Sequence, residues 1–147
     1  MTAKLDPYAA APTLMKHFMG LSVAVNDSLE ASLVELVKIR ASIINQCANC
    51  INMHTTEARA KGESEQRLYL LAAWHEAPCY SDRERAALAW TDALTTIAQG
   101  HTQEAAHAAL AEHFTPEEQV KLTLGINIIN AWNRVAIGFG LWIEPAP

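Results

Sequence analysis

The chain has 147 residues, of which 50% are hydrophobic and 18% are charged, and its formal net charge is −5. This length is typical of one domain, and the composition excludes a disordered chain. The few lysines and arginines are scattered, so we expect no nucleic-acid partner. We therefore expect a single domain that covers residues 1–147.

The N-terminus and the cysteines indicate a cytoplasmic protein. The first residues, MTAKLDPYAA, contain no apolar run of the kind that a signal peptide needs. Polar residues such as Asn127 and Arg134 interrupt the longest apolar stretches, so we expect no membrane partner. Three cysteines are an odd number, which does not fit a secreted disulfide framework.

The sequence pattern predicts an all-α fold. Alanine is abundant, and no stretch alternates apolar and polar residues as a half-buried strand would. We expect a single-domain bundle of about seven helices, over residues 11–21, 28–44, 47–61, 65–76, 82–98, 103–113 and 117–138. We find no linker and no internal repeat.

Several predicted helix starts have a recognisable cap. In a capping box, a polar N-cap residue is followed three positions later by a glutamate or glutamine. Three pairs in the chain fit this pattern: Asp27 with Glu30, Ser81 with Glu84, and Thr115 with Glu118. Pro116 also suits the first position of the last helix.

The predicted helix over residues 28–44 is apolar on nearly every side. Such a helix is buried, either in the core or beneath a partner subunit, so we expect the chain to oligomerise through apolar helices. Glu35 lies in this helix, with Lys38 as its main polar neighbour. A buried carboxylate needs a partner, and burial tends to raise its pKa.

The segment QCANCINMHTTEA carries the most informative pattern. Cys47, Cys50 and His54 stand at positions i, i+3 and i+7, which places them on one stripe of a helix. The spacing alone leaves three readings open: thiol redox chemistry, metal binding, or two small residues in a core.

In the redox reading, Glu35, His54 and a cysteine form a proton relay. The thiolate is the nucleophile, an imidazole can take its proton, and a carboxylate fixes the tautomer of that imidazole. The second cysteine can then close a disulfide on an oxidised partner. A position near the helix N-terminus favours Cys47 as the thiolate, whereas the nearby imidazole favours Cys50. The residues alone leave this choice open.

In the metal reading, C-x2-C-x3-H supplies three zinc ligands. Cys79, His75 or Glu35 could supply the fourth. The cysteines run directly into a helical segment, and no second ligand pair exists, which weakens this reading. Cys79 follows Pro78 at a helix junction, and we expect it to be an isolated small residue.

Taken together, the residues resemble a known family. Glu35, Cys47, Cys50 and His54, at their spacing, resemble the core of the alkylhydroperoxidase D family of the carboxymuconolactone decarboxylase superfamily. The segments TTEARAKGESEQRLYLLAAW and INAWNRVAIGF are also similar to it. The resemblance covers nearly the whole chain and is closest to the small single-domain members.

The resemblance implies a thiol-dependent peroxidase that works without a metal or other cofactor. It implies that the Cys50 thiolate attacks the peroxide, that Cys47 resolves the product as a disulfide, and that His54 and Glu35 relay the proton. The relay argument also favours Cys50, because peroxide reduction needs proton delivery to the leaving oxygen. The implied partners are a hydroperoxide substrate and a dithiol electron donor such as a lipoylated protein. The implied assembly is a homo-oligomer, either a trimer or a hexamer.

Asn49 departs from the family pattern, because the best-known member has a histidine just before its second cysteine. The alternatives are therefore a metal- or ligand-binding relative on the same scaffold, or an enzyme that resembles the decarboxylase. For a decarboxylase, Arg40 is the one nearby candidate to bind a carboxylate. The last helix carries a group of residues that suggests a hydrogen-bond network at a subunit interface or, as a second reading, a pocket wall near the cysteines: Asn130, Trp132, Asn133 and Arg134. We expect Trp132 to be a core or interface anchor.

Overall fold

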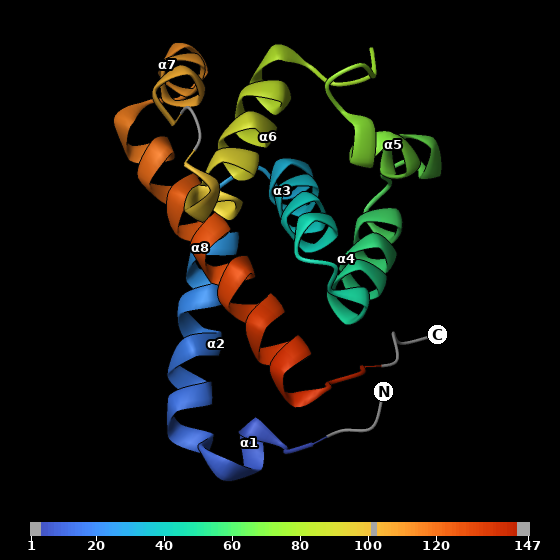
Figure 1. The fold of residues 1–147 in the computed structure, drawn as a ribbon, viewed down its shortest axis with the longest axis vertical. Helices are drawn as coiled ribbons and strands as arrows, with labels where there is room; N and C mark the ends of the chain where they lie inside the picture. The colour runs from blue at the N-terminus through green and yellow to red at the C-terminus, as the bar shows by residue number, and fades with distance from the viewer. Residues whose placement is uncertain (1–3, 101–102, 144–147) are drawn as a thin grey trace.

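The computed structural model describes residues 4–100 and 103–143, and the regular secondary structure in them is entirely helical (Figure 1). The predicted all-α fold is therefore confirmed. The described part contains eight α-helices and two short 3-10 helices: α1 (Pro7–Ala10), α2 (Pro12–Asn26), α3 (Ala31–Ile44), α4 (Ala48–Ala60), α5 (Glu65–Leu70), η1 (Leu71–Ala73), α6 (Asp82–Thr95), η2 (Ile97–Gln99), α7 (Gln103–His113) and α8 (Pro116–Phe139).

Two of the three predicted capping boxes are present. At Ser81 and at Thr115, the side chain accepts a hydrogen bond from the third backbone N–H, and the glutamate at that position reaches back to the cap. The third prediction, at Asp27, is wrong. Asp27 has helical backbone angles (φ −77°, ψ −2°) at the end of α2, whereas an N-cap needs an extended backbone. Helix α3 consequently begins at Ala31, and α2 extends to Asn26.

The predicted helix over residues 11–21 corresponds to α2, which continues to Asn26. The short helix α1 was not predicted, and Ala11, which leaves the helical conformation, separates it from the start of α2 at Pro12. The predicted helix over residues 65–76 is regular only as far as Leu70, and it tightens into η1 before a turn.

Helix α3 occupies the centre of the bundle, against α4, α6 and α8 (Figure 1). One face, with Leu36 and Ile39, packs on side chains from α4 to α6 in one hydrophobic cluster. A second face, with Leu33 and Val37, packs on α6, α7 and α8 in a second cluster. The apolar faces of α3 are therefore buried within the core of this one chain.

A narrow polar stripe runs along the remaining side of α3. Glu35, Lys38, Ser42 and Asn45 stand at positions i, i+3, i+7 and i+10, which share one face of a helix. The first three are buried. The stripe therefore requires polar partners from the neighbouring helices, and these partners define the site described below.

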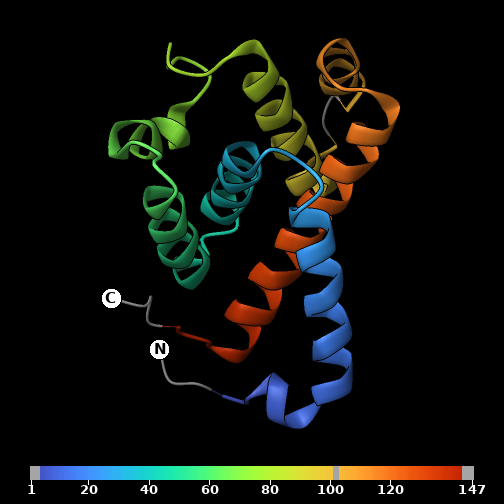
Figure 2. The same cartoon turned by 180° about the vertical axis from the view of Figure 1, so that it is seen from behind.

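Helix α8 lies between α2 on one side and the pair α3 and α4 on the other, in both views of the fold (Figures 1 and 2). The chain after α8 returns toward the start of the described residues, where the Lys4 N–H donates to the Phe139 carbonyl at 2.9 Å. Helix α2 packs mainly on α1 and α8, so it lies at the edge of the bundle.

Large apolar side chains are exposed on the outer helices. They include Leu14, Leu21 and Val23 on α2, and Val120, Leu124 and Ile137 on α8. These exposed faces are compatible with assembly, and the homo-oligomer stays a prediction. In the described ranges, no helix combines the length and hydropathy that a membrane crossing requires.

Candidate functional site

The connection between α3 and α4 fixes the position of the cysteine pair. Gln46 adopts a left-handed backbone (φ 57°), which ends α3 and reverses the chain within two residues. The Cys47 N–H then donates to the Ser42 carbonyl at 2.9 Å. Cys47 is the N-cap of α4, and its Sγ accepts the N–H of Cys50 at 3.4 Å. Both sulfurs therefore lie at the N-terminal end of α4, where the helix dipole favours negative charge.

Cys47 and Cys50 form a disulfide, with their Cα atoms 5.4 Å apart. Their exposed fractions are 1% and 2%, and they pack against Ala136 of α8. The two residues are therefore close enough for reversible thiol–disulfide chemistry without a movement of the backbone.

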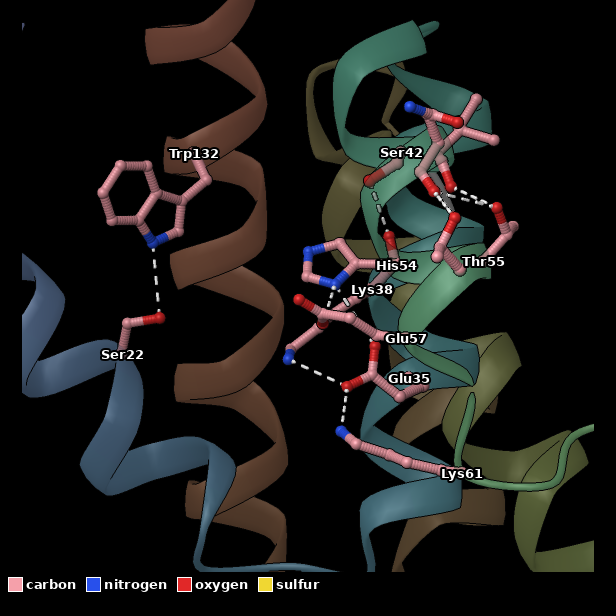
Figure 3. Close-up of polar contacts among 12 residues, drawn as sticks. Ser22, Glu35, Lys38, Ser42, His54, Thr55, Glu57, Lys61 and Trp132 are labelled. Carbon is pink, nitrogen blue, oxygen red and sulfur yellow. Dashed lines mark hydrogen bonds and ion pairs between the residues drawn. The ribbon is translucent and has the colours of Figure 1, made fainter. Parts of the chain in front are cut away.

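His54 lies one helical turn after Cys50 on α4, and both residues line the same cavity. The Nδ1 atom of His54 is hydrogen-bonded to Glu57 Oε2 at 3.2 Å. It also lies 3.2 Å from Glu35 Oε2, which is an ion-pair distance without hydrogen-bond alignment. The other ring nitrogen points away from these carboxylates, toward α8 (Figure 3). That nitrogen is therefore available to a molecule in the cavity.

Glu35 is nearly inaccessible and is held by two lysines. Its Oε1 accepts from Lys61 Nζ at 3.0 Å and from Lys38 Nζ at 3.4 Å (Figure 3). Burial alone would raise the pKa of Glu35, but its contacts with His54, Lys38 and Lys61 outweigh that effect and lower the pKa to about 2. Glu35 is therefore ionised at neutral pH.

The two carboxylates hold a proton on His54. Burial would lower the pKa of His54, but its contacts with Glu35 and Glu57 outweigh burial and raise the pKa above the usual value. The same hydrogen bond to His54 lowers the pKa of Glu57. The imidazole is thus oriented by Nδ1, and its second nitrogen can exchange a proton with the cavity.

The cavity has a volume of about 250 Å³ and is lined by residues of α1, α2, α3, α4, α8 and the segment after α8. Cys50, His54, Lys38 and Glu57 form one end of it. Most of the remaining wall is apolar and includes Met19, Met53, Ile128, Ile129, Trp132 and Leu141. A small, mostly apolar molecule fits such a wall.

Cys47 faces a different surface. It lines a shallow groove of about 520 Å³ with Ala48, Ile137 and Gly140. Asn49 and the segment after α8 line both the groove and the cavity, and the Asn49 Oδ1 accepts the N–H of Ile143 at 2.6 Å. Asn49 therefore fastens the segment after α8 beside the disulfide.

The asparagines of α8 form a network within the chain. Asn45 of α3 donates to Asn130 at 2.9 Å and to Asn133 at 2.8 Å. Asn133 donates to Ser42 at 3.0 Å, and Arg134 donates to the Asn130 carbonyl at 2.7 Å. This network joins α8 to the polar stripe of α3, so its partners lie in the same chain. Trp132 lines the cavity beside Cys50 and His54, which agrees with the pocket-wall reading, and it donates to Ser22 at 3.3 Å.

The ligand set of the metal reading is not assembled. Within residues 4–100 and 103–143, one group of three candidate metal ligands has its donor atoms within 4.8 Å of one another, and it consists of Glu35, His54 and Glu57. The disulfide occupies both cysteines. Cys79 is a free thiol that packs against the first hydrophobic cluster. The two lysines on Glu35 also disfavour a metal cation there.

Arg40, the candidate carboxylate binder of the decarboxylase reading, has other partners. Its Nε and Nη2 atoms donate to the two oxygens of Asp92 at 2.6 and 2.9 Å. Its Nη1 donates to backbone carbonyls near η1. The guanidinium therefore ties α3 to α6, on a side of the bundle remote from the cavity wall.

The structure brings Glu35, Cys50 and His54 to one place, with Cys47 beside them. Sequence reasoning missed Glu57, Lys61 and the role of Lys38. The signal was present in the spacing, because Glu57 stands three positions after His54 and Lys61 seven positions after it, on the same side of α4.

Comparison with known proteins identifies the family. The model of the carboxymuconolactone decarboxylase family matches residues 9–93, which is more than half of the chain. The chain belongs to this family. It is 40% identical over 141 residues to the uncharacterized protein YdfG of Bacillus subtilis (strain 168), covering 95% of this chain and 96% of YdfG.

Solved structures agree with the assignment. ATU0492 of Agrobacterium tumefaciens, a protein of unknown function suggested to be the antioxidant defence protein AhpD, is 41% identical and has a TM-score of 0.92. The alignment covers 99% of this chain and 100% of ATU0492. The debrominase Bmp8, in complex with 2,3,4-tribromopyrrole, is 20% identical with a TM-score of 0.82, over 92% of this chain and 73% of Bmp8. The latter similarity concerns the fold alone. The chain is thus a small, AhpD-like member of the family.

Proposed function

We propose that this protein is a thiol-dependent peroxidase, in which Cys50 is the thiolate that attacks a hydroperoxide. The observation that carries the proposal is the shared cavity of Cys50 and His54, next to a second cysteine in disulfide distance. His54 is backed by Glu35 and Glu57, which keep Nδ1 protonated and leave the second nitrogen for the substrate.

The reaction balances with these groups. The Cys50 thiolate attacks the terminal oxygen of ROOH, an S–O bond forms, and the O–O bond breaks. The leaving alkoxide takes a proton from His54 and departs as ROH, while Cys50 becomes a sulfenic acid. The Cys47 thiol then attacks the Cys50 sulfur, the disulfide forms, and the hydroxyl group leaves as water. Glu35 orients His54 and stabilises its protonated form.

An external dithiol must return two electrons for each turnover. Its thiolate attacks one sulfur of the Cys47–Cys50 disulfide, and its second thiol releases the mixed disulfide. A lipoylated protein is one donor of this class. Cys47 faces the groove rather than the cavity, so a donor could reach it without displacing the substrate.

A single-turnover experiment tests the proposal. The protein is reduced, stripped of metal and given one equivalent of cumene hydroperoxide, while peroxide and intact mass are followed. We expect rapid peroxide loss and a mass decrease of two hydrogens that maps to Cys47–Cys50. No peroxide loss, with both thiols still free, would refute the activity toward this substrate and favour the non-peroxidase alternatives.

Three cysteine variants assign the roles. Cys50→Ser should abolish peroxide consumption, and Cys47→Ser should stop after one equivalent with a sulfenic acid on Cys50. Cys79→Ser is the matched control, because Cys79 lies outside the site. Full activity in Cys50→Ser would show that the assignment is wrong.

A further inference from the structure

Lys38 is a buried cation that the peroxidase steps do not use. It is 9% exposed and lines the cavity that contains Cys50 and His54. Its ammonium group points from α3 toward α8 (Figure 3). Lysines are seldom buried unless their charge is compensated, so the ammonium group of Lys38 requires acceptors around it.

The contacts of Lys38 leave its charge incompletely coordinated. An ammonium has three N–H donors, and Nζ has one acceptor among the described residues, Glu35 Oε1 at 3.4 Å. That oxygen receives the shorter bond, 3.0 Å, from Lys61. Lys61 is therefore the closer donor to Glu35. The N–H groups of Lys38 that have no acceptor in the part of the chain that the structure describes remain for a molecule in the cavity.

The charges around this end of the cavity are balanced. Glu35 and Glu57 carry two negative charges, and Lys38 and Lys61 carry two positive charges. When His54 also carries a proton, these groups have an excess of one positive charge, and one added negative charge neutralises it. Two added charges would exceed this compensation and would be repelled by Glu57, which lines the same cavity, so a monoanion fits better than a dianion such as a phosphate monoester.

The rest of the cavity wall favours a ligand with an apolar body. The wall is mostly hydrocarbon, with side chains such as Met53, Ile129 and Trp132, and it encloses about 250 Å³. A molecule of this size that buries its chain against such a wall gains free energy in proportion to its apolar area. The site thus combines the ammonium group of Lys38 with an apolar cavity.

We propose that the cavity binds small apolar carboxylates, with the carboxylate on Lys38 Nζ and the hydrocarbon part against the wall near Trp132. If the peroxidase function proposed above holds, its preferred substrates are hydroperoxides that carry such a carboxylate. Only this second statement rests on the proposed function. The binding site itself follows from Lys38 and the cavity.

Binding of unreactive ligands tests the site without any redox chemistry. Octanoate and octan-1-ol share an eight-carbon body and differ in the charge of the head group. We expect the oxidised wild-type protein to bind octanoate about tenfold or more tightly than octan-1-ol in calorimetric titrations, because a buried charge-assisted hydrogen bond has about this effect. Equal binding of the two ligands, or tighter binding of the alcohol, would overturn the proposal.

Two lysine variants locate the cation. Lys38→Met should lower octanoate affinity at least about tenfold and leave octan-1-ol binding unchanged, which also shows that the variant is folded. Lys61→Met is the matched control, because Lys61 contacts the same Glu35 oxygen but lines a different pocket. It should keep the preference for octanoate. An equal loss in both lysine variants would assign the effect to Glu35 and refute the role of Lys38.

The outcome is independent of the peroxidase experiment. Turnover of cumene hydroperoxide without a preference for octanoate would leave the peroxidase standing and remove this inference. A preference for octanoate without any peroxide consumption would establish the carboxylate site and remove the peroxidase. The comparison within the wild-type protein decides the question even where a variant does not fold.

Discussion

Replacement of Glu35 by glutamine tests the ion network at the centre of the site. The lysines and His54 lower the pKa of Glu35 from its usual 4.5 to about 2. Each pH unit between the folded and unfolded values corresponds to about 1.4 kcal/mol, so ionised Glu35 contributes about 3 kcal/mol to the free energy of unfolding. The variant also leaves Lys38 with a weaker acceptor in a buried place.

The sign of the pH dependence follows from the lowered pKa. Above about pH 4.5 the carboxyl group is ionised in both the folded and the unfolded chain, and its full contribution is present. As pH falls toward 2, the unfolded chain takes up a proton first, and the contribution disappears. The wild-type protein should therefore exceed Glu35→Gln by about 3 kcal/mol at pH 7, and this difference should shrink steadily below pH 4.5.

Urea unfolding followed by circular dichroism, at several values between pH 7 and pH 3, measures this difference. Glu76→Gln is a suitable control, because it removes the same charge at an exposed position and should change stability by less than about 0.5 kcal/mol. A difference between the wild-type protein and Glu35→Gln that stays constant across this range would refute the reasoning. It would mean that the network does not hold the pKa of Glu35 below its usual value.

Three further changes test other parts of the site. The raised pKa of His54 stabilises the fold most below about pH 6.5, and this stabilisation is lost as pH rises through the folded value, so His54→Gln should flatten the stability profile between pH 6 and 9 in urea titrations. Asn49→Ala removes the acceptor of the Ile143 N–H, and it should speed amide exchange there and cost about 1 kcal/mol. Asn133→Ala breaks the bonds to Asn45 and Ser42 and should cost about 2 kcal/mol by thermal unfolding, and a loss below about 0.5 kcal/mol would contradict the role of the network.

The parts of the fold that sequence predicted well are those with local signals. The starts of α6 and α8 were found because Ser81 and Thr115 each carry a complete capping box that needs no distant partner. The same pattern failed at Asp27, because α2 continues through that region and leaves Asp27 in a helical conformation. The extent of α2 depends on its packing against α8, which a local window does not contain.

In the site, too, the residues with a local sequence signal could be predicted, and those that depend on tertiary packing could not. Cys47, Cys50 and His54 could be grouped from spacing, because they share one helix. The cavity could not be predicted, since its wall combines α2, α4, α8 and the segment near Leu141. The disulfide and the contact between Glu35 and His54 were expected from the resemblance and the relay argument, and Lys38 was visible as a neighbour of Glu35 on the same helix. The contact of Lys61 with Glu35 emerged only with the packing of α3 against α4.

The polar stripe of α3 links the stability of the fold to the chemistry of the site. Glu35 meets Lys61 and His54 from α4, and Ser42 meets Asn133 from α8, so the groups that orient the imidazole also hold the three helices together. A variant in this stripe will therefore change both activity and stability. Activity should be compared where both proteins are folded, at neutral pH and well below their unfolding temperatures. Under those conditions, a Glu35→Gln protein that binds octan-1-ol normally but consumes peroxide slowly has lost the orientation of His54 and not the fold.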